Sequence, residues 1–177
     1  MAGHVSRTGA MILISMLQFS VLITEAYGQN EVINKIRSLY NISQKDKPNY
    51  TKTTLDGFYE STEGQQVIAY KDNKEVCLIE VITFGHTGKS EEQYYFNNGK
   101  LYFAFTKSHN YNTPISLPSY DSTKTSINEH RYYFWENKMI RYTLPNGTQM
   151  NINSSEFANI EEDVLDNAVK ILKRFEK

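Results

Sequence analysis

Most of the chain between residues 53 and 143 consists of short segments rich in aromatic and β-branched residues, separated by clusters of turn-forming residues. Such residues favour strands, and Asn, Asp and Gly at short intervals favour the tight turns of β-hairpins. Successive hairpins form an antiparallel meander, because each strand pairs with the one before it. The predicted strands are Thr53–Tyr59, Gln65–Tyr70, Glu75–Phe84, Glu91–Phe96, Lys100–Lys107, Arg131–Trp135 and Lys138–Thr143.

A short amphipathic helix is predicted before the first strand. Asn30 is a suitable N-cap, because an asparagine side chain accepts a hydrogen bond from a free backbone N–H of the first turn. The charged segment Ser43–Tyr50, which contains Pro48, is expected to break the helix. The apolar positions recur at helical spacing and are Val32, Ile33, Ile36, Leu39 and Tyr40.

A longer amphipathic helix is predicted at the other end of the chain, with Ser155 as its cap. Acidic residues gather near its start and basic residues near its end, which suits the helix dipole. Its apolar stripe consists of Phe157, Ile160, Val164, Leu165, Ala168, Ile171, Leu172 and Phe175. The expected fold class is therefore α+β: an antiparallel β-meander of about six to eight strands, with a short N-terminal helix and a longer C-terminal amphipathic helix packed on the sheet.

The first 28 residues have the order of a secretory signal peptide. Met1–Ala10 holds Arg7 and no acidic residue, Met11–Ile23 is largely apolar, and Ala26 and Gly28 occupy the −3 and −1 positions of a cleavage site. The apolar run is shorter than the roughly 20 residues of a membrane-spanning helix. We therefore expect cleavage after Gly28, a single mature domain over residues 29–177, and a periplasmic or secreted protein without a transmembrane span.

The composition limits the cellular compartment and the classes of partner that we expect for this protein. Cys77 is the only cysteine, so an internal disulfide is excluded, whereas small secreted eukaryotic domains usually carry several. We therefore expect a bacterial envelope or secreted protein. The net charge of −1 gives no support for a nucleic-acid partner, because proteins that bind nucleic acids usually present a basic face.

One hairpin sequence occurs twice. Gln93–Phe105 and Arg131–Thr143 both contain a polar residue, Tyr-Tyr-Phe, a three-residue turn ending in Gly or Asn, then Lys and an apolar residue. Ala69–Glu80 is a fainter copy. The spacings between the copies differ, so the pattern is not that of a regular solenoid. We expect a sheet assembled from duplicated hairpins.

The first copy carries a resemblance to known proteins. Tyr94–Leu101 resembles the "YY-x-x-NGKL" hairpins of MORN-variant repeat proteins, and hairpins in uncharacterised exported proteins of Bacteroidetes and related bacteria. The second copy departs from the pattern, with Asn137 where Gly is expected. The resemblance implies a β-meander and a binding or structural role, and it supplies no catalytic residues.

The sequence predicts no catalytic residue, no metal site and no cofactor. The histidines lack the short spacing of a zinc motif, and no Gly-x-Ser-x-Gly segment is present. Cys77 is expected to be a buried structural thiol within a strand. A small envelope enzyme remains an alternative only if His109, Glu129 and His130, near the two ends of a long loop, converge in one cleft.

Residues 108–128 are expected to form that long loop. Loops longer than roughly 15 residues are uncommon in compact domains and are usually functional or disordered. Tyrosine together with serine and asparagine makes an adaptable contact surface. The loop is therefore either a binding element or a flexible insertion between the duplicated hairpins.

The aromatic content indicates a second candidate surface. The chain has 13 tyrosines and 9 phenylalanines, and neighbours such as Tyr94 and Tyr95 cannot share one face of a strand. The second face is either a contact surface or part of a two-faced core. The predicted function is an exported, non-enzymatic binding protein whose partner is a protein or glycan in the envelope or outside the cell. The alternatives are a small envelope enzyme, an enzyme inhibitor, and an accessory subunit of an envelope complex. The candidate binding residues are Tyr102, His109, Tyr111, Asn112, Tyr120 and Trp135.

Overall fold

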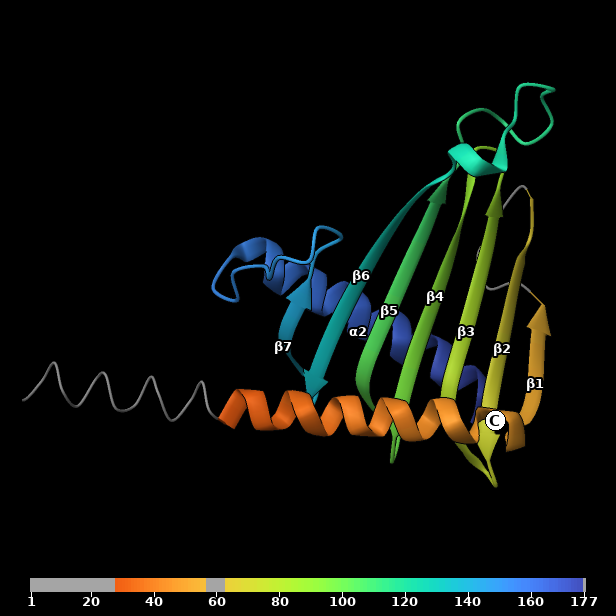
Figure 1. Cartoon of the computed structure of the whole chain (residues 1–177). Coiled ribbons are helices and arrows are strands. Elements are labelled where there is room, and N and C mark those ends of the chain that lie inside the picture. Colours follow the sequence, from red (N-terminus) through yellow and green to blue (C-terminus); the bar gives the residue numbers. More distant parts are fainter. Residues whose placement is uncertain (1–27, 57–62, 177) are drawn as a thin grey trace, which may run out of the picture.

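The computed structural model describes residues 28–56 and 63–176, and it shows one antiparallel sheet between two helices (Figure 1). All seven strands lie in chain order, so every strand pairs with its sequence neighbours, and the predicted α+β meander is confirmed. The strands are β1 (Thr51–Asp56), β2 (Gln65–Asp72), β3 (Glu75–Gly85), β4 (Gly88–Asn97), β5 (Lys100–Asn110), β6 (Ser126–Trp135) and β7 (Lys138–Thr143).

Three strands extend further toward the long loop than the sequence predicts. β4 begins at Gly88, β5 continues to Asn110, and β6 begins at Ser126, so the loop covers residues 111–125 and not 108–128. His109 pairs with Ile127 in this extension. The polar side chains at these strand ends do not prevent it, because the backbone groups form the hydrogen bonds between strands. The end of the first predicted strand, residues 57–59, and residues 1–27 of the predicted leader lie outside the described residues.

The N-terminal helix is described over residues 28–46, and the 3₁₀ turn η1 (Lys47–Asn49) follows it. Asn30 lies inside the helix, so its assignment as N-cap is wrong. The helix also continues beyond the predicted break at Ser43, because Ser43 is buried against the sheet and polar residues are tolerated on the solvent side. Regular helix ends just before η1, where Pro48 lacks a backbone donor.

The C-terminal helix α2 (Ser155–Phe175) is confirmed, with a different cap. Its N-cap is Ser154, whose hydroxyl accepts a hydrogen bond of 3.1 Å from the backbone N–H of Phe157, so the assignment of Ser155 is wrong by one residue. The predicted apolar stripe packs on the sheet: its buried members are Phe157, Ala168, Ile171, Leu172 and Phe175, and its partly buried members are Ile160, Val164 and Leu165.

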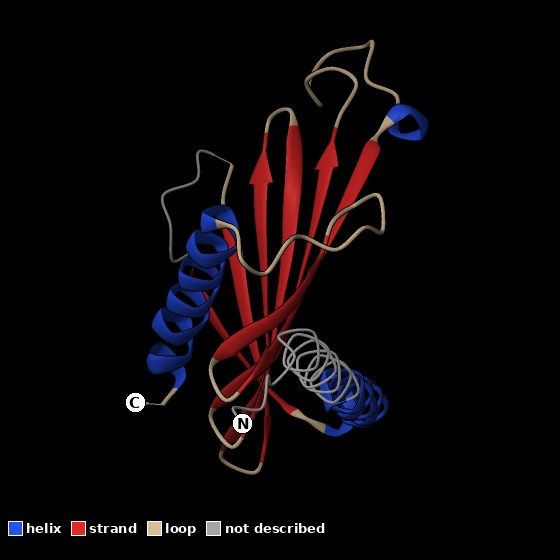
Figure 2. Cartoon of the chain, turned by 90° about the vertical axis from the view of Figure 1, so that its left-hand side faces the viewer, coloured by secondary structure: helices blue, strands red, loops and turns tan. Residues whose placement is uncertain are grey.

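The sheet has a hydrophobic core on each face. Figure 2 shows the two helices on opposite sides of the sheet. Tyr94 packs in the cluster that contains α2, whereas Tyr95 packs under the N-terminal helix with Ile33 and Ile36. Both tyrosines are buried, so the two-faced core is the correct alternative for these rings.

The repeated sequence produces repeated backbone geometry. The pairing register shifts just after Tyr70, Tyr95 and Tyr133, the corresponding residues of the three hairpin copies. The turn of the first full copy has Gly99 at a positive φ of 70°, and Asn137 has a φ of 61° at the same place in the second. Asparagine tolerates this left-handed conformation better than most residues, which explains how Asn137 replaces glycine.

Candidate functional site

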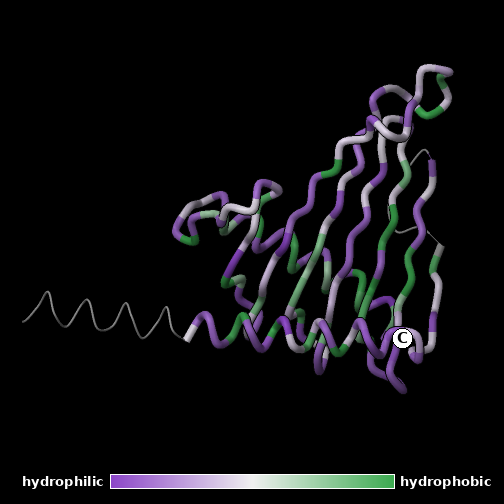
Figure 3. Tube along the Cα trace, in the orientation of Figure 1, coloured by the Kyte–Doolittle hydropathy of each residue, from purple (hydrophilic) through white to green (hydrophobic). Residues whose placement is uncertain are grey.

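The N-terminal helix covers only part of the sheet face on which it packs. The helix crosses the strands close to the hairpin turns (Figure 1), and beyond it the side chains of β4, β5 and β6 are mostly half-buried. These strand segments are largely hydrophilic toward the long loop (Figure 3). The boundary between the helix and this polar half of the face is where a cavity lies.

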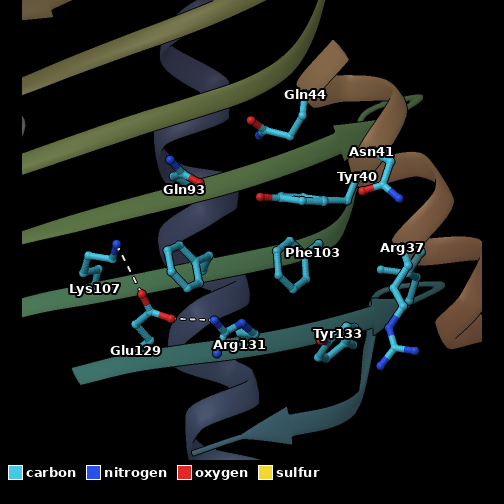
Figure 4. Close-up of a pocket in the computed structure, with 12 residues that line it drawn as sticks. Arg37, Tyr40, Asn41, Gln44, Gln93, Phe103, Lys107, Glu129, Arg131 and Tyr133 are labelled. Atoms are coloured by element: carbon cyan, nitrogen blue, oxygen red, sulfur yellow. Dashed lines mark hydrogen bonds and ion pairs between the residues drawn. The ribbon is translucent and has the colours of Figure 1, made fainter. Parts of the chain in front are cut away.

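A cavity of about 560 Å³ follows this boundary, and we call it the helix–sheet groove. Its size falls within the range of roughly 300–1,000 Å³ that is typical of small-ligand sites. Figure 4 shows the side chains of the helix and of the strands converging on it. The lining residues are Ile36, Arg37, Tyr40, Asn41, Gln44, Gln93, Phe103, Phe105, Lys107, Glu129, Arg131 and Tyr133.

Aromatic rings form the floor of the groove. Phe103 and Tyr133 are buried, and their ring centroids lie 5.1 Å apart. Tyr40 of the helix meets Phe103 edge to face at 5.3 Å. Phe105 is half-buried, and the guanidinium carbon of Arg131 lies 5.2 Å from its ring centroid. The floor therefore offers ring surface beside a cation, the arrangement of a cation–π contact.

The helix contributes a polar wall. Arg37, Asn41 and Gln44 follow one another at spacings of four and three residues, so they lie on one side of the helix. Arg37 and Asn41 are exposed, whereas Gln44 is half-buried. The amide of Gln44 donates a hydrogen bond of 2.6 Å to the hydroxyl of Tyr95. Two of these three side chains thus reach the groove from solvent, and the third is held by the sheet.

The charged side chains of the groove carry an excess of positive charge. Glu129 accepts contacts from Lys107 at 3.2 Å and from Arg131 at 2.5 Å, so one carboxylate serves two cations. Arg37 is a third cation. Burial alone would raise the pKa of Glu129, but hydrogen bonds from Lys107 and Arg131 outweigh it and lower that pKa. Glu129 is therefore an anion held in place and not a proton donor at neutral pH.

Four of the candidate binding residues lie in or beside the long loop, away from the groove. Tyr111 and Tyr120 are half-buried and pack edge to face at 5.2 Å. Asn112 donates a hydrogen bond of 3.0 Å to the carbonyl of Ser119, so its amide serves the fold of the loop. His109 Nε2 lies 3.2 Å from a carboxylate oxygen of Glu91, without the alignment of a hydrogen bond.

The other two candidates lie at the opposite ends of the strands. Tyr102 is buried, and Trp135 is half-buried with Lys35 Nζ 4.6 Å from its ring centroid. Both line a small cavity of about 220 Å³ beside the N-terminal helix. The structure therefore brings together Tyr102 with Trp135 and Tyr111 with Tyr120, but it does not unite the six residues in one site.

The convergence that an enzyme would need at the ends of the loop does not occur. Glu129 and His130 are consecutive in β6, so they point to opposite faces of the sheet. His130 Nδ1 lies 2.6 Å from the hydroxyl of Tyr142 on the α2 face. Burial lowers the pKa of His130. His109 and Glu129 share the face under the N-terminal helix, but only Glu129 lines the groove, and His130 points to the opposite face. The prediction that these three residues share a cleft is therefore wrong.

Cys77 is half-buried, whereas the sequence predicted a buried structural thiol. Its Sγ lies 3.7 Å from the carbonyl oxygen of Glu75, and burial raises the pKa of the thiol. The residue lines a second cavity of about 570 Å³ beside the same helix, together with Asp46 and Asp72. Within the described ranges, no three His, Cys, Asp or Glu side chains are placed to hold a metal ion.

None of the residues that line the groove is among the six candidate binding residues predicted from the sequence. The sequence nevertheless contains a pattern that indicates this polar wall. Arg37, Asn41 and Gln44 follow one another at spacings of four and three residues, so they form a polar row along one side of the helix. On the sheet, Phe105 and Lys107 alternate with residues of the other face. What the sequence lacks is the direction in which the helix crosses the sheet, and this direction decides which strand residues meet the helical stripe.

Comparisons with known proteins give no further assignment: the chain matches no family model, no curated protein and no solved structure at a significant level. Among the residues that the structure describes, no helix combines the length and the apolar character needed to cross a membrane.

Proposed function

We propose that this protein is an exported, non-enzymatic binding protein that holds an oligosaccharide in the helix–sheet groove. The observation that carries the proposal is the aromatic floor beside a row of amide and charged side chains. A sugar ring presents apolar C–H groups that pack on an aromatic ring, and its hydroxyls exchange hydrogen bonds with amides and charged groups. Export is supported by the signal-peptide pattern of residues 1–28.

The aromatic floor and the polar side chains of the groove would contact different parts of a bound sugar. Phe105 offers a half-buried ring at the floor, and Asn41 of the helix offers an exposed amide above it. Gln93 lies on the neighbouring strand and accepts a hydrogen bond of 2.7 Å from Tyr95, which orients its amide. A ligand in the groove therefore meets an apolar surface on one side and fixed hydrogen-bonding groups on the other, the usual composition of a small-ligand site.

The test is binding of the purified protein to a microarray of neutral and acidic oligosaccharides. We expect at least one class of oligosaccharide to bind, and Phe105→Ala to weaken it about tenfold, which corresponds to about 1.4 kcal/mol of lost ring contact. Phe84→Ala is the matched control, because Phe84 is 42% exposed and lies outside the groove. Absence of binding by the folded protein would overturn the proposal. Loss in Tyr120→Ala with retention in Phe105→Ala would move the site to the loop.

A second candidate function is that of an accessory subunit, and a separate observation favours it. Four large apolar side chains at the loop end of the molecule are exposed: Phe84 by 42%, Ile115 by 51%, Leu117 by 47% and Ile127 by 53%. Exposed apolar groups gathered in one region are typical of protein–protein contact sites. Leu117→Ser should abolish co-purification of a protein partner from the native envelope fraction, while Phe105→Ala should not affect it.

A further inference from the structure

Two cations lie beside the half-buried ring of Phe105 in the floor of the helix–sheet groove. Arg131 of β6 pairs directly with Phe105 of β5, and Lys107 follows two residues later in β5, so all three side chains share the face under the N-terminal helix. The Nζ of Lys107 lies 5.8 Å from the centroid of the Phe105 ring, and the guanidinium carbon of Arg131 lies 5.2 Å from it. A sugar that packs on this ring therefore has two cations close to its substituents.

Both cations line the groove and are accessible to a ligand. The side chain of Lys107 is 29% exposed and that of Arg131 is 39% exposed. Each contacts the carboxylate of Glu129, Lys107 through Nζ at 3.2 Å and Arg131 through Nη2 at 2.5 Å (Figure 4). An ammonium group carries three N–H donors and a guanidinium group five, so one contact with Glu129 leaves each cation with donors for a ligand.

The lining of the groove carries more positive than negative charge. Arg37 adds a third cation from the helix, whereas Glu129 is the only acidic residue among the lining residues. Another carboxylate on this face, that of Glu91, lies across the strands from Lys107 but does not line the groove, and it forms an ion pair of 2.6 Å with Lys89. Three cations and one carboxylate therefore surround the cavity. A cleft lined by an excess of one charge attracts ligands of the opposite charge.

We infer that Lys107 and Arg131 form an anion site of the groove, and that the ligand is an acidic oligosaccharide whose uronate carboxylate is held there while the sugar ring packs on Phe105. Ammonium and guanidinium groups make charge-assisted hydrogen bonds to carboxylates, and these are stronger than hydrogen bonds between neutral groups. The carboxylate of a uronate is attached directly to the sugar ring, so a ring on Phe105 brings its carboxylate close to both cations. The sugar part of this inference rests on the proposed function, whereas the anion site rests on the two cations and their access to the groove.

The anion site is tested first with a monosaccharide. The Nε–Hε signals of ¹⁵N-labelled arginine are followed by NMR during titration with sodium galacturonate and, in parallel, with neutral galactose, both at constant ionic strength. We expect galacturonate to give a saturable shift of the Arg131 signal that galactose does not give, with the exposed Arg174 of α2 as the internal reference. A shift of Arg131 no larger than that of Arg174 would overturn the anion site.

The ligand class is tested with two pairs of trisaccharides, trigalacturonate with galactotriose and cellotriuronate with cellotriose, and affinities are measured by calorimetry. We expect the acidic member of at least one pair to bind about tenfold more tightly than its neutral partner. Lys107→Gln and Arg131→Gln should each reduce this ratio at least about threefold. Lys89→Gln is the matched control and should leave the ratio unchanged, because Lys89 also pairs with a glutamate and is similarly exposed, at 31%, but lies outside the groove.

The outcomes separate this inference from the proposed function. Equal binding of acidic and neutral members would overturn the acidic class and leave the proposed function standing. A galacturonate response of Arg131 without binding of any trisaccharide would overturn the oligosaccharide function and support the anion site. An equal loss of the ratio in Lys89→Gln and Lys107→Gln would overturn the site, because it would show an effect of overall charge alone.

Discussion

Gln44 of the N-terminal helix donates a 2.6 Å hydrogen bond to the hydroxyl of Tyr95, a fully buried residue at the centre of the sheet. The same hydroxyl donates to the amide oxygen of Gln93 at 2.7 Å. Burial raises the pKa of Tyr95, with a further rise from the neighbouring Tyr40, so the hydroxyl stays protonated. One buried hydroxyl therefore joins the helix to the strand at the edge of the groove.

Removing this hydroxyl should weaken the contact between the helix and the sheet. In Tyr95→Phe the ring stays in place and both glutamines lose a partner, but they reach the groove and can bond to water. We therefore expect a loss of about 1 kcal/mol in the free energy of unfolding, measured by urea denaturation. Tyr133→Phe is the matched control, because no hydrogen bond of its hydroxyl is found among the described residues, and its loss should be close to zero. Equal losses in both variants would contradict the role of the Tyr95 hydroxyl.

Glu80 connects the end of the N-terminal helical segment to the sheet. Among the acidic residues, we expect its substitution to lower the free energy of unfolding most. Its carboxylate accepts contacts from Lys47 at 2.6 Å, from the hydroxyl of Tyr70 at 2.6 Å and from Gln93 at 3.0 Å. Glu80→Ala leaves three polar groups without their partner, and we expect a loss of about 1–3 kcal/mol in the free energy of unfolding. Glu136→Ala, which removes an exposed ion pair with Lys100, should change stability little. A result in which the two variants match would contradict this assignment.

The order of the helices and strands could be predicted from the local sequence, whereas the residues at which they begin and end could not. The β4–β5 and β6–β7 turns each contain residues suited to positive φ, such as Asn98 and Asn137, and both hairpins form as predicted. The strand ends at His109 and Ile127 carry no local signal, since they are extended by pairing with each other. Ser43 likewise stays helical because it is buried by tertiary packing, which local propensity does not register.

The candidate site was harder to predict for a geometric reason. Aromatic residues such as Tyr111 and Tyr120 attract attention in a loop, but they pack on each other. The groove depends on how the N-terminal helix crosses the sheet, and that angle is fixed by long-range contacts such as the hydrogen bond of 2.6 Å from the Gln29 amide to the Ile140 carbonyl. Contacts between residues so distant in the chain leave no pattern in a single sequence.

The cap of α2 provides a test with a neighbouring control. Ser154 accepts a hydrogen bond from the Phe157 N–H, whereas Ser155 is the first residue of the helix. We expect Ser154→Ala to lower the free energy of unfolding by about 1 kcal/mol, because it leaves that N–H without its side-chain partner. Ser155→Ala should be nearly neutral, since alanine is a good helix former. Thermal and urea unfolding of both variants would check the order, and a larger loss in Ser155→Ala would restore the cap predicted from the sequence.

His130 should make the stability of the protein fall in mild acid. Its ring stacks on Tyr132 and Tyr142, with centroid distances of 6.3 and 5.8 Å. Burial raises the pKa of both tyrosines, with a further rise from Glu92 at Tyr132 and from Glu156 of α2 at Tyr142. Burial lowers the pKa of His130 below its ordinary value of 6.5, because the site disfavours the imidazolium.

The sign of the pH effect follows from proton uptake in the two states. Below the ordinary value of 6.5, His130 is protonated in the unfolded chain before it is protonated in the folded one. The stabilising contribution of the neutral ring is therefore present above that pH, and it is lost as the pH falls toward the folded pKa. We expect the free energy of unfolding to decline between pH 7 and pH 5 more steeply in the wild type than in His130→Gln, which cannot titrate there. His86→Gln, a change of an exposed histidine in the β3–β4 turn, controls for the loss of one imidazole. Parallel pH profiles of the wild type and His130→Gln would show that the folded and unfolded states bind the His130 proton equally.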